Sequence, residues 1–173
     1  MTLSEKIERV FAHRGMPDAA VDTTGLFQID SDVEEALWFS GRDWHGLTWR
    51  DWQDHSCAIF FFDPGAFAYY LPSLLLLSAR NPSESLDAAD SLLSQLDRSP
   101  DPEGWTDGFV SRFLGLNTEE LDVLKEWLFQ VCEYVPYKGV GLAASGPGDT
   151  FGRAFDTINL VQKEVERRRT ASR

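Results

Sequence analysis

Residues 57–79 read CAIFFFDPGAFAYYLPSLLLLSA and form the most apolar stretch of the chain. Asp63 is its single charged residue, and Pro64 follows directly. Aspartate at the N-cap and proline at the first helical position form a strong helix start signal. The apolar residues after it recur at helical spacing and extend to other faces: Phe67, Tyr70, Leu71, Leu74, Leu75, Leu76, Leu77 and Ala79. The stretch therefore predicts a central, buried helix that begins at Pro64.

Pro72 lies inside this predicted helix. Proline lacks the backbone N–H of a helical residue, so we expect either a kink or a break between two packed pieces. The apolar stretch is long enough to cross a bilayer, but Asp63 and Pro64 divide it, and a central aspartate costs roughly 2.5–3.5 kcal/mol on insertion. We expect the core of a globular, cytoplasmic protein and no membrane partner.

Helix start signals recur along the rest of the chain. Thr2 with Glu5 and Asn117 with Glu120 form capping boxes before apolar residues at helical spacing. Similar signals predict five further helices: from Asp30–Asp32 to Ser40, over residues 49–55 after Thr48, from Ser83 or Ser85 to Leu96, within residues 105–116, and from Asp149 or Thr150 to the arginines at 167–169.

The predicted fold class is all-α, a compact multi-helix domain around a central kinked helix. One short strand or hairpin remains an alternative, because residues 26–29 fit an extended segment as well. The sequence has no internal repeat and no long linker, so residues 1–173 are predicted to form a single domain. Its last part, residues 166–173, is predicted to be a frayed basic tail.

The chain is strongly acidic, with 28 Asp and Glu against 16 Lys and Arg and a net charge of −12. A nucleic-acid binder needs a basic footprint, so nucleic acid is excluded as a partner. Such a surface keeps a protein soluble and also steers basic partners toward it. Cys57 and Cys132 stand in apolar surroundings and are expected to be buried, reduced thiols.

Catalytic and cofactor motifs fail on spacing or context. Residues 139–144 match the dinucleotide pattern G-x-G-x-x-A, but Pro136 precedes them and Gly146-Pro147-Gly148 stands where the helix should run. The three histidines lack the spacing of metal ligands, and no nucleophile motif occurs. We expect no catalytic residue, no cofactor and no metal.

A cluster of tryptophan and aspartate is the most unusual local feature. If this cluster is exposed, it would suit a partner that carries Arg or Lys side chains. We favour the alternative, in which Trp49 and Trp52 pack a short helix onto the core. The candidate partner-binding residues are Asp43, Trp44, Trp49, Asp51, Trp52 and Asp54.

Residues 43–72 resemble a bacterial family of unknown function. Its pattern, W-x-x-L-T followed by a hydrophobic run and P-x-A-F-x-Y-Y-L-P, corresponds to residues 44–48 and 64–72. The helix start at Asn117 is compatible with the rest of the family. The resemblance implies a small bacterial helical protein and implies no activity or site residue.

Two functions from different classes are compatible with the sequence. The first is a non-enzymatic acidic protein that binds a basic protein, such as an immunity protein that neutralises a bacterial toxin. The second is a small enzyme or ligand-binding domain. Its site would lie near residues 44–55, where His45 and His55 flank Asp51 and Asp54, and near the glycine-rich residues 136–150. The oligomeric state is left open.

Overall fold

The computed structural model describes residues 1–24, 29–81, 84, 86–98, 100–134 and 147–171. Over these residues the protein is all-α, as predicted, and contains no strand. The predicted extended segment at 26–29 falls mostly outside the described residues. The elements are α1 (Leu3–Phe11), α2 (Ser31–Leu37), η1 (Trp44–Gly46), α3 (Trp49–Asp54), η2 (Ala58–Phe60), α4 (Pro64–Arg80), α5 (Asp87–Leu96), η3 (Pro102–Gly104), α6 (Asp107–Phe113), α7 (Thr118–Tyr134) and α8 (Pro147–Ala171).

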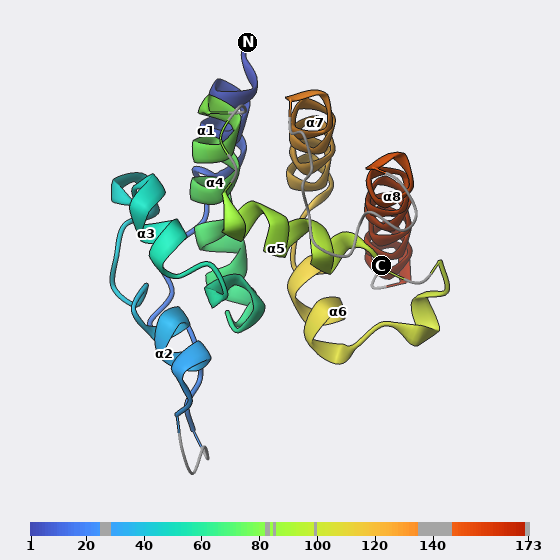
Figure 1. Ribbon diagram of the computed structural model, residues 1–173. Helices are drawn as coiled ribbons and strands as arrows, with labels where there is room; N and C mark the ends of the chain where they lie inside the picture. Colours follow the sequence, from blue (N-terminus) through green and yellow to red (C-terminus); the bar gives the residue numbers. More distant parts are fainter. Residues whose placement is uncertain (25–28, 82–83, 85, 99, 135–146, 172–173) are drawn as a thin grey trace.

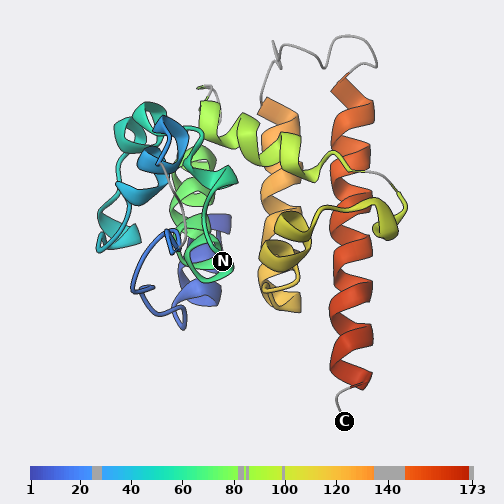
Figure 2. The same ribbon diagram turned by 90° about the horizontal axis from the view of Figure 1, so that it is seen from below.

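The helices are arranged around α4. α1 packs against α4 and α7, while α8 packs against α7 and α5. Figures 1 and 2 both show α2 and α3 on one side of the molecule and α8 on the opposite side. α8 is the longest helix, and Figure 2 shows its C-terminal part extending beyond its neighbours. The molecule therefore has two distinct ends, separated by α4 and α7.

α4 is the central helix that the apolar stretch predicted, with 13 of its 17 residues buried. It is continuous from Pro64 to Arg80, so of the two outcomes expected at Pro72, a kink or a break, the break does not occur. Pro72 removes a single backbone donor, and packing on nearly every face of α4 holds the two halves in one helix. No helix in the described part of the chain is both long and apolar enough to cross a membrane.

Asp63 precedes α4 as the N-cap, as predicted, but its side chain does not bind the helix. Its Oδ2 instead accepts a hydrogen bond from the backbone N–H of Asp22 at 2.7 Å. The backbone N–H of Asp63 donates to the carbonyl of Ala20 at 3.0 Å. The start of the central helix is thus fixed to the segment between α1 and α2.

Two buried serines of α4 bind tryptophans of other helices. The indole Nε1 of Trp52, in α3, donates to Ser73 Oγ at 3.0 Å. The indole Nε1 of Trp127, in α7, donates to Ser78 Oγ at 2.8 Å. Both indoles are fully buried, so each N–H would be unsatisfied without its serine. The serines therefore connect α4 to helices on both sides.

Other predicted helix starts are partly confirmed. Thr2 caps α1, Asp30 caps α2 and Thr48 caps α3. The start predicted at Ser83 or Ser85 falls on residues outside the described ones, and the described helix α5 begins later, at Asp87 after Leu86. Leu86 is buried, and it occupies the N-cap position without a side-chain cap.

The last helix also begins earlier than predicted. α8 starts at Pro147 rather than after Asp149 or Thr150, because proline suits the first turn of a helix. It continues through Ala171, so residues 166–171 belong to the helix. Val165 packs against the core just before them.

Candidate functional site

The predicted tryptophan cluster lies mostly in the core. Trp44 is 2% exposed and Trp52 is fully buried, while Trp49 is half-buried against the core. The Trp52 ring lies 4.7 Å from the ring of Phe39, centroid to centroid. These positions agree with the favoured alternative, in which the tryptophans pack short helices onto the domain.

The predicted aspartates lie at the surface beside them. Asp43 and Asp54 are exposed, and Asp51 is half-buried because its side chain caps α3 together with Thr48. Asp43 Oδ1 accepts a hydrogen bond from the backbone N–H of His45 at 2.9 Å and interacts with its Nδ1 at 2.8 Å. These bonds lower the pKa of Asp43 below its ordinary value, so it is ionised at neutral pH.

Negative charge is concentrated around these aspartates. Residues 18–63, here called the acidic end, hold ten carboxylates and two arginines, a net charge of −8 out of −12 for the chain. They include α2, η1 and α3, which lie opposite α8 (Figures 1 and 2). Seven of the ten carboxylates are exposed: Asp18, Asp22, Asp30, Asp32, Glu34, Asp43 and Asp54.

Both arginines of the acidic end are already engaged. Arg50 pairs with Asp54 at 3.3 Å. The guanidinium of Arg42 lies 3.7 Å from the centroid of the Trp38 ring, and its Nε donates to the Trp38 carbonyl at 2.8 Å. Most carboxylates of the acidic end therefore form no ion pair with any described residue, and this surface carries an excess of negative charge.

The histidines of this region contact different side chains. His45 stacks on Trp44, with centroids 3.7 Å apart, and binds Asp43. The His55 ring stacks on the Trp38 ring, with centroids 4.4 Å apart, and its buried Nδ1 has no hydrogen-bond partner among the described residues. No group of His, Cys, Asp and Glu suited to a metal ion occurs among the described residues. The glycine-rich half of the alternative ligand site lies largely outside those residues.

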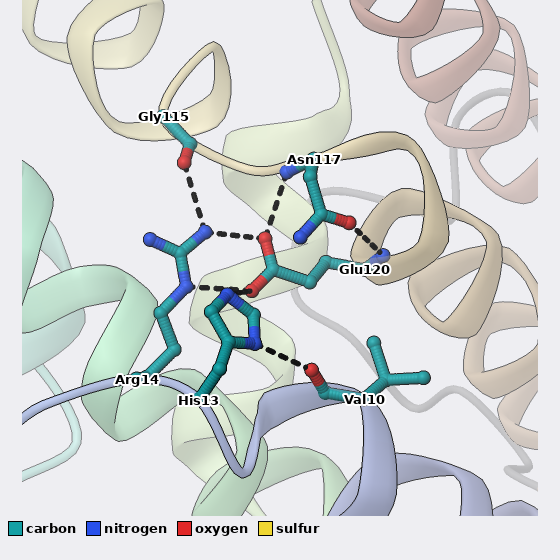
Figure 3. A network of polar contacts seen from close by, with 6 residues as sticks. All are labelled: Val10, His13, Arg14, Gly115, Asn117 and Glu120. Atoms are coloured by element: carbon teal, nitrogen blue, oxygen red, sulfur yellow. Dashed lines mark hydrogen bonds and ion pairs between the residues drawn. The ribbon is translucent and has the colours of Figure 1, made fainter.

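A second polar cluster lies elsewhere, and only its Asn117–Glu120 part was predicted from the sequence. Glu120 is fully buried, and its Oε1 accepts a hydrogen bond from Arg14 Nε at 2.6 Å (Figure 3). Its Oε2 is bound by Arg14 Nη2 and by the backbone N–H of Asn117, the latter at 2.7 Å. Arg14 Nη2 also donates to the carbonyl of Gly115 at 2.9 Å. We call this the Arg14–Glu120 clasp.

His13 lies at the edge of the clasp. Its Nε2 is 3.6 Å from Glu120 Oε1, and its Nδ1 is 2.9 Å from the carbonyl of Val10 (Figure 3). The capping box predicted the bonds between Asn117 and Glu120, but Arg14 is 106 residues away from Glu120 in the chain. Because both carboxylate oxygens are satisfied within the protein, the clasp is a structural joint and not a site for a ligand.

Comparison with models of known families, with curated proteins and with solved structures finds no match to this chain.

Proposed function

We propose that the protein is a non-enzymatic binding protein whose acidic end receives a basic protein partner. The observation that carries this proposal is the net negative charge of residues 18–63. This segment has ten carboxylates but only two arginines, and the arginines already contact Asp54 and Trp38. A field of one sign raises the encounter rate with an oppositely charged partner and disfavours partners of the same sign.

The buried tryptophans have a supporting role in this proposal. Trp44 and Trp52 hold η1 and α3 on the core, so the neighbouring carboxylates of Asp43 and Asp54 are presented from short, fixed elements. A rigid surface loses less conformational entropy on binding than a flexible one. Of the six predicted contact residues, the exposed Asp43 and Asp54 would touch the partner, and the buried Trp44 and Trp52 would position them.

The narrower form of the proposal is an immunity protein that neutralises a basic bacterial toxin. Small size, strong acidity and the lack of a recognisable catalytic motif support it. Enzymes that act on nucleic acid carry basic surfaces, and an acidic inhibitor is complementary to such a surface. A reading frame for a basic protein beside this one would add further support.

Affinity capture with charge variants tests the proposal. The face variant is Asp32→Asn/Glu34→Gln/Asp54→Asn, which removes three exposed carboxylates from the acidic end. The control variant is Glu119→Gln/Asp156→Asn/Glu166→Gln, which removes three exposed carboxylates from α7 and α8. Wild-type protein and the control should retain the same basic partner from a lysate of the source cells, and the face variant should lose it.

The captured partner should also be released by moderate salt, because salt screens contacts between exposed charges. Co-expression with a toxin from the neighbouring reading frame should protect cells only when the acidic end is intact. A partner that binds the face variant as well as the wild type, or the recovery of no specific partner, would contradict the proposal.

A further inference from the structure

Two arginines lie where the end of α5 meets η2 and α6. Arg98 follows α5, and its Nε donates to the carbonyl of Gln95 at 2.7 Å. Arg112 lies in α6, and its Nη1 donates to the carbonyl of Phe60, in η2, at 2.7 Å. The Arg98 guanidinium is 5.1 Å from the ring centroid of Phe109, which lies about one helical turn before Arg112. Both arginines are half-buried.

These two arginines differ from the other half-buried cations in the described part of the protein. Each of those cations has a carboxylate partner: Lys6 with Glu126, Arg14 with Glu120, Lys125 with Asp122 and Arg153 with Asp97. Neither Arg98 nor Arg112 is paired with any described carboxylate. In a chain with a net charge of −12, two adjacent unpaired cations withdrawn from water are unexpected.

The surroundings of Arg112 leave its charge uncompensated. Burial and then the like charge of Arg98 lower the pKa of Arg112 from its ordinary value. Among the described residues, its Nε–H has no hydrogen-bond acceptor although the atom is buried. Buried polar atoms without a partner are rare in folded proteins, and a bound ion is one way in which such atoms become satisfied.

We propose that Arg98 and Arg112 together bind a tetrahedral dianion of the phosphate class. A guanidinium presents parallel N–H donors that match two oxygens of one phosphate. Arg98 binds the protein through Nε and Arg112 through Nη1, so each retains terminal donors for a ligand. Two positive charges match the charge of a phosphate, about −1.5 to −2 at neutral pH, better than that of a single carboxylate.

This site uses none of the carboxylates of the proposed partner surface, although Arg112 binds the carbonyl of Phe60 within residues 18–63. The net charge of the chain repels anions in general, so saturable binding of a dianion would have to arise from a local arrangement of cations. Phosphate binding at this position would fix the end of α5 to α6 through one shared ligand.

The test is a titration of the full chain with inorganic phosphate at pH 7, with sodium chloride holding ionic strength constant. We expect saturable shifts of the Arg98 and Arg112 Nε–Hε signals in NMR spectra. The melting temperature should rise by about 2–4 °C for each kcal/mol of binding free energy that is linked to folding. Sulfate should replace phosphate, and acetate should not.

Matched variants separate the arginine pair from general charge. Arg98→Gln/Arg112→Gln should weaken phosphate binding at least about tenfold, because hydrogen bonds to charged groups are lost. The control, Arg9→Gln/Arg169→Gln, removes two exposed arginines and the same charge, and should bind phosphate within about twofold of wild type. If the double variant does not fold, Arg98→Gln alone serves, since Arg112 then keeps its bond to Phe60.

Three results would overturn the site: NMR shifts that do not saturate with phosphate, binding of acetate as strong as that of phosphate, or an equal loss of phosphate affinity in the control variant.

Discussion

Glu120 connects parts of the chain that are far apart in sequence. Its buried carboxylate accepts hydrogen bonds from Arg14 and from the backbone of Asn117, while Arg14 also holds the carbonyl of Gly115. A buried ion pair is not a large net source of stability, because both groups lose their hydration. Losing one partner is costly, however, because the other charge then remains buried and unpaired.

We therefore expect Arg14→Leu to lower the free energy of unfolding by about 2–3 kcal/mol, somewhat less than for a fully buried pair because Arg14 is partly exposed. The double variant Arg14→Leu/Glu120→Gln should lose less than the sum of the two single variants. Urea unfolding at pH 7 measures these differences. Arg9→Leu, an exposed position of α1, is the control and should change stability by less than about 0.5 kcal/mol. Strict additivity of the two single variants would contradict the coupling.

Tyr70 provides a test at high pH. Its hydroxyl donates to the carbonyl of Phe39 at 2.5 Å, and burial raises its pKa from 10.0 to about 12. Because the folded-state pKa is the higher one, the folded protein holds this proton more tightly than the unfolded chain. The stabilisation is fully present below about pH 10 and is lost as the pH rises through about 12; at most it amounts to about 2–3 kcal/mol.

Between pH 9 and pH 12 the wild type should consequently lose more stability than Tyr70→Phe, which has no proton to release at this position. Urea midpoints at a series of pH values measure the difference. Absorbance of the phenolate should show one tyrosine that ionises about two pH units late. The same loss of stability in both proteins would argue against a buried, protonated Tyr70.

At the scale of elements, α4 depends on its two buried serines. Removing Ser78 leaves the indole N–H of Trp127 without an acceptor, and removing Ser73 does the same for Trp52. We expect Ser78→Ala and Ser73→Ala each to cost about 1–3 kcal/mol in thermal or urea unfolding. Ser111→Ala, at an exposed position of α6, should be nearly neutral. If Ser78→Ala is also neutral, the hydrogen bond does not contribute to the joint between α4 and α7.

The start of a helix was predictable where residues within one turn of it determine that start. The boxes at Thr2 and Asn117 and the cap at Thr48 act over three residues, and the structure confirms each of them. The start of α5 was not predictable in this way, because buried Leu86 precedes it without a side-chain cap. The continuity of α4 through Pro72 likewise depends on packing from other helices.

The candidate site was likewise predictable only in its local features and not in its tertiary contacts. The sequence placed tryptophan and aspartate close together, but only the tertiary structure decides that Trp44 and Trp52 are buried while Asp43 and Asp54 are exposed. The pairing of Arg14 with Glu120 joins residues 106 positions apart, and no local pattern indicates it. The juxtaposition of Arg98 with Arg112 is hidden for the same reason.

On the scale of the whole molecule, charge is distributed unevenly. The acidic end has a net charge of −8, and repulsion within it opposes the compact state. Raising the ionic strength from about 0.01 M to 0.1 M shortens the screening length from about 30 Å to about 10 Å. We expect the melting temperature to rise over this range. The rise should be smaller in the Asp32→Asn/Glu34→Gln/Asp54→Asn variant than in Glu119→Gln/Asp156→Asn/Glu166→Gln, and equal slopes would contradict this assignment.

The Arg14–Glu120 clasp also has a consequence for synthesis of the chain on the ribosome. Arg14 is made 106 residues before Glu120, which at typical translation rates is a delay of roughly 5–20 s. During this time α1 lacks α7, against which it packs in the finished protein. Until α7 has been made, α1 can pack only against α4, which is synthesised earlier, so the contacts of α1 are completed in two separate steps.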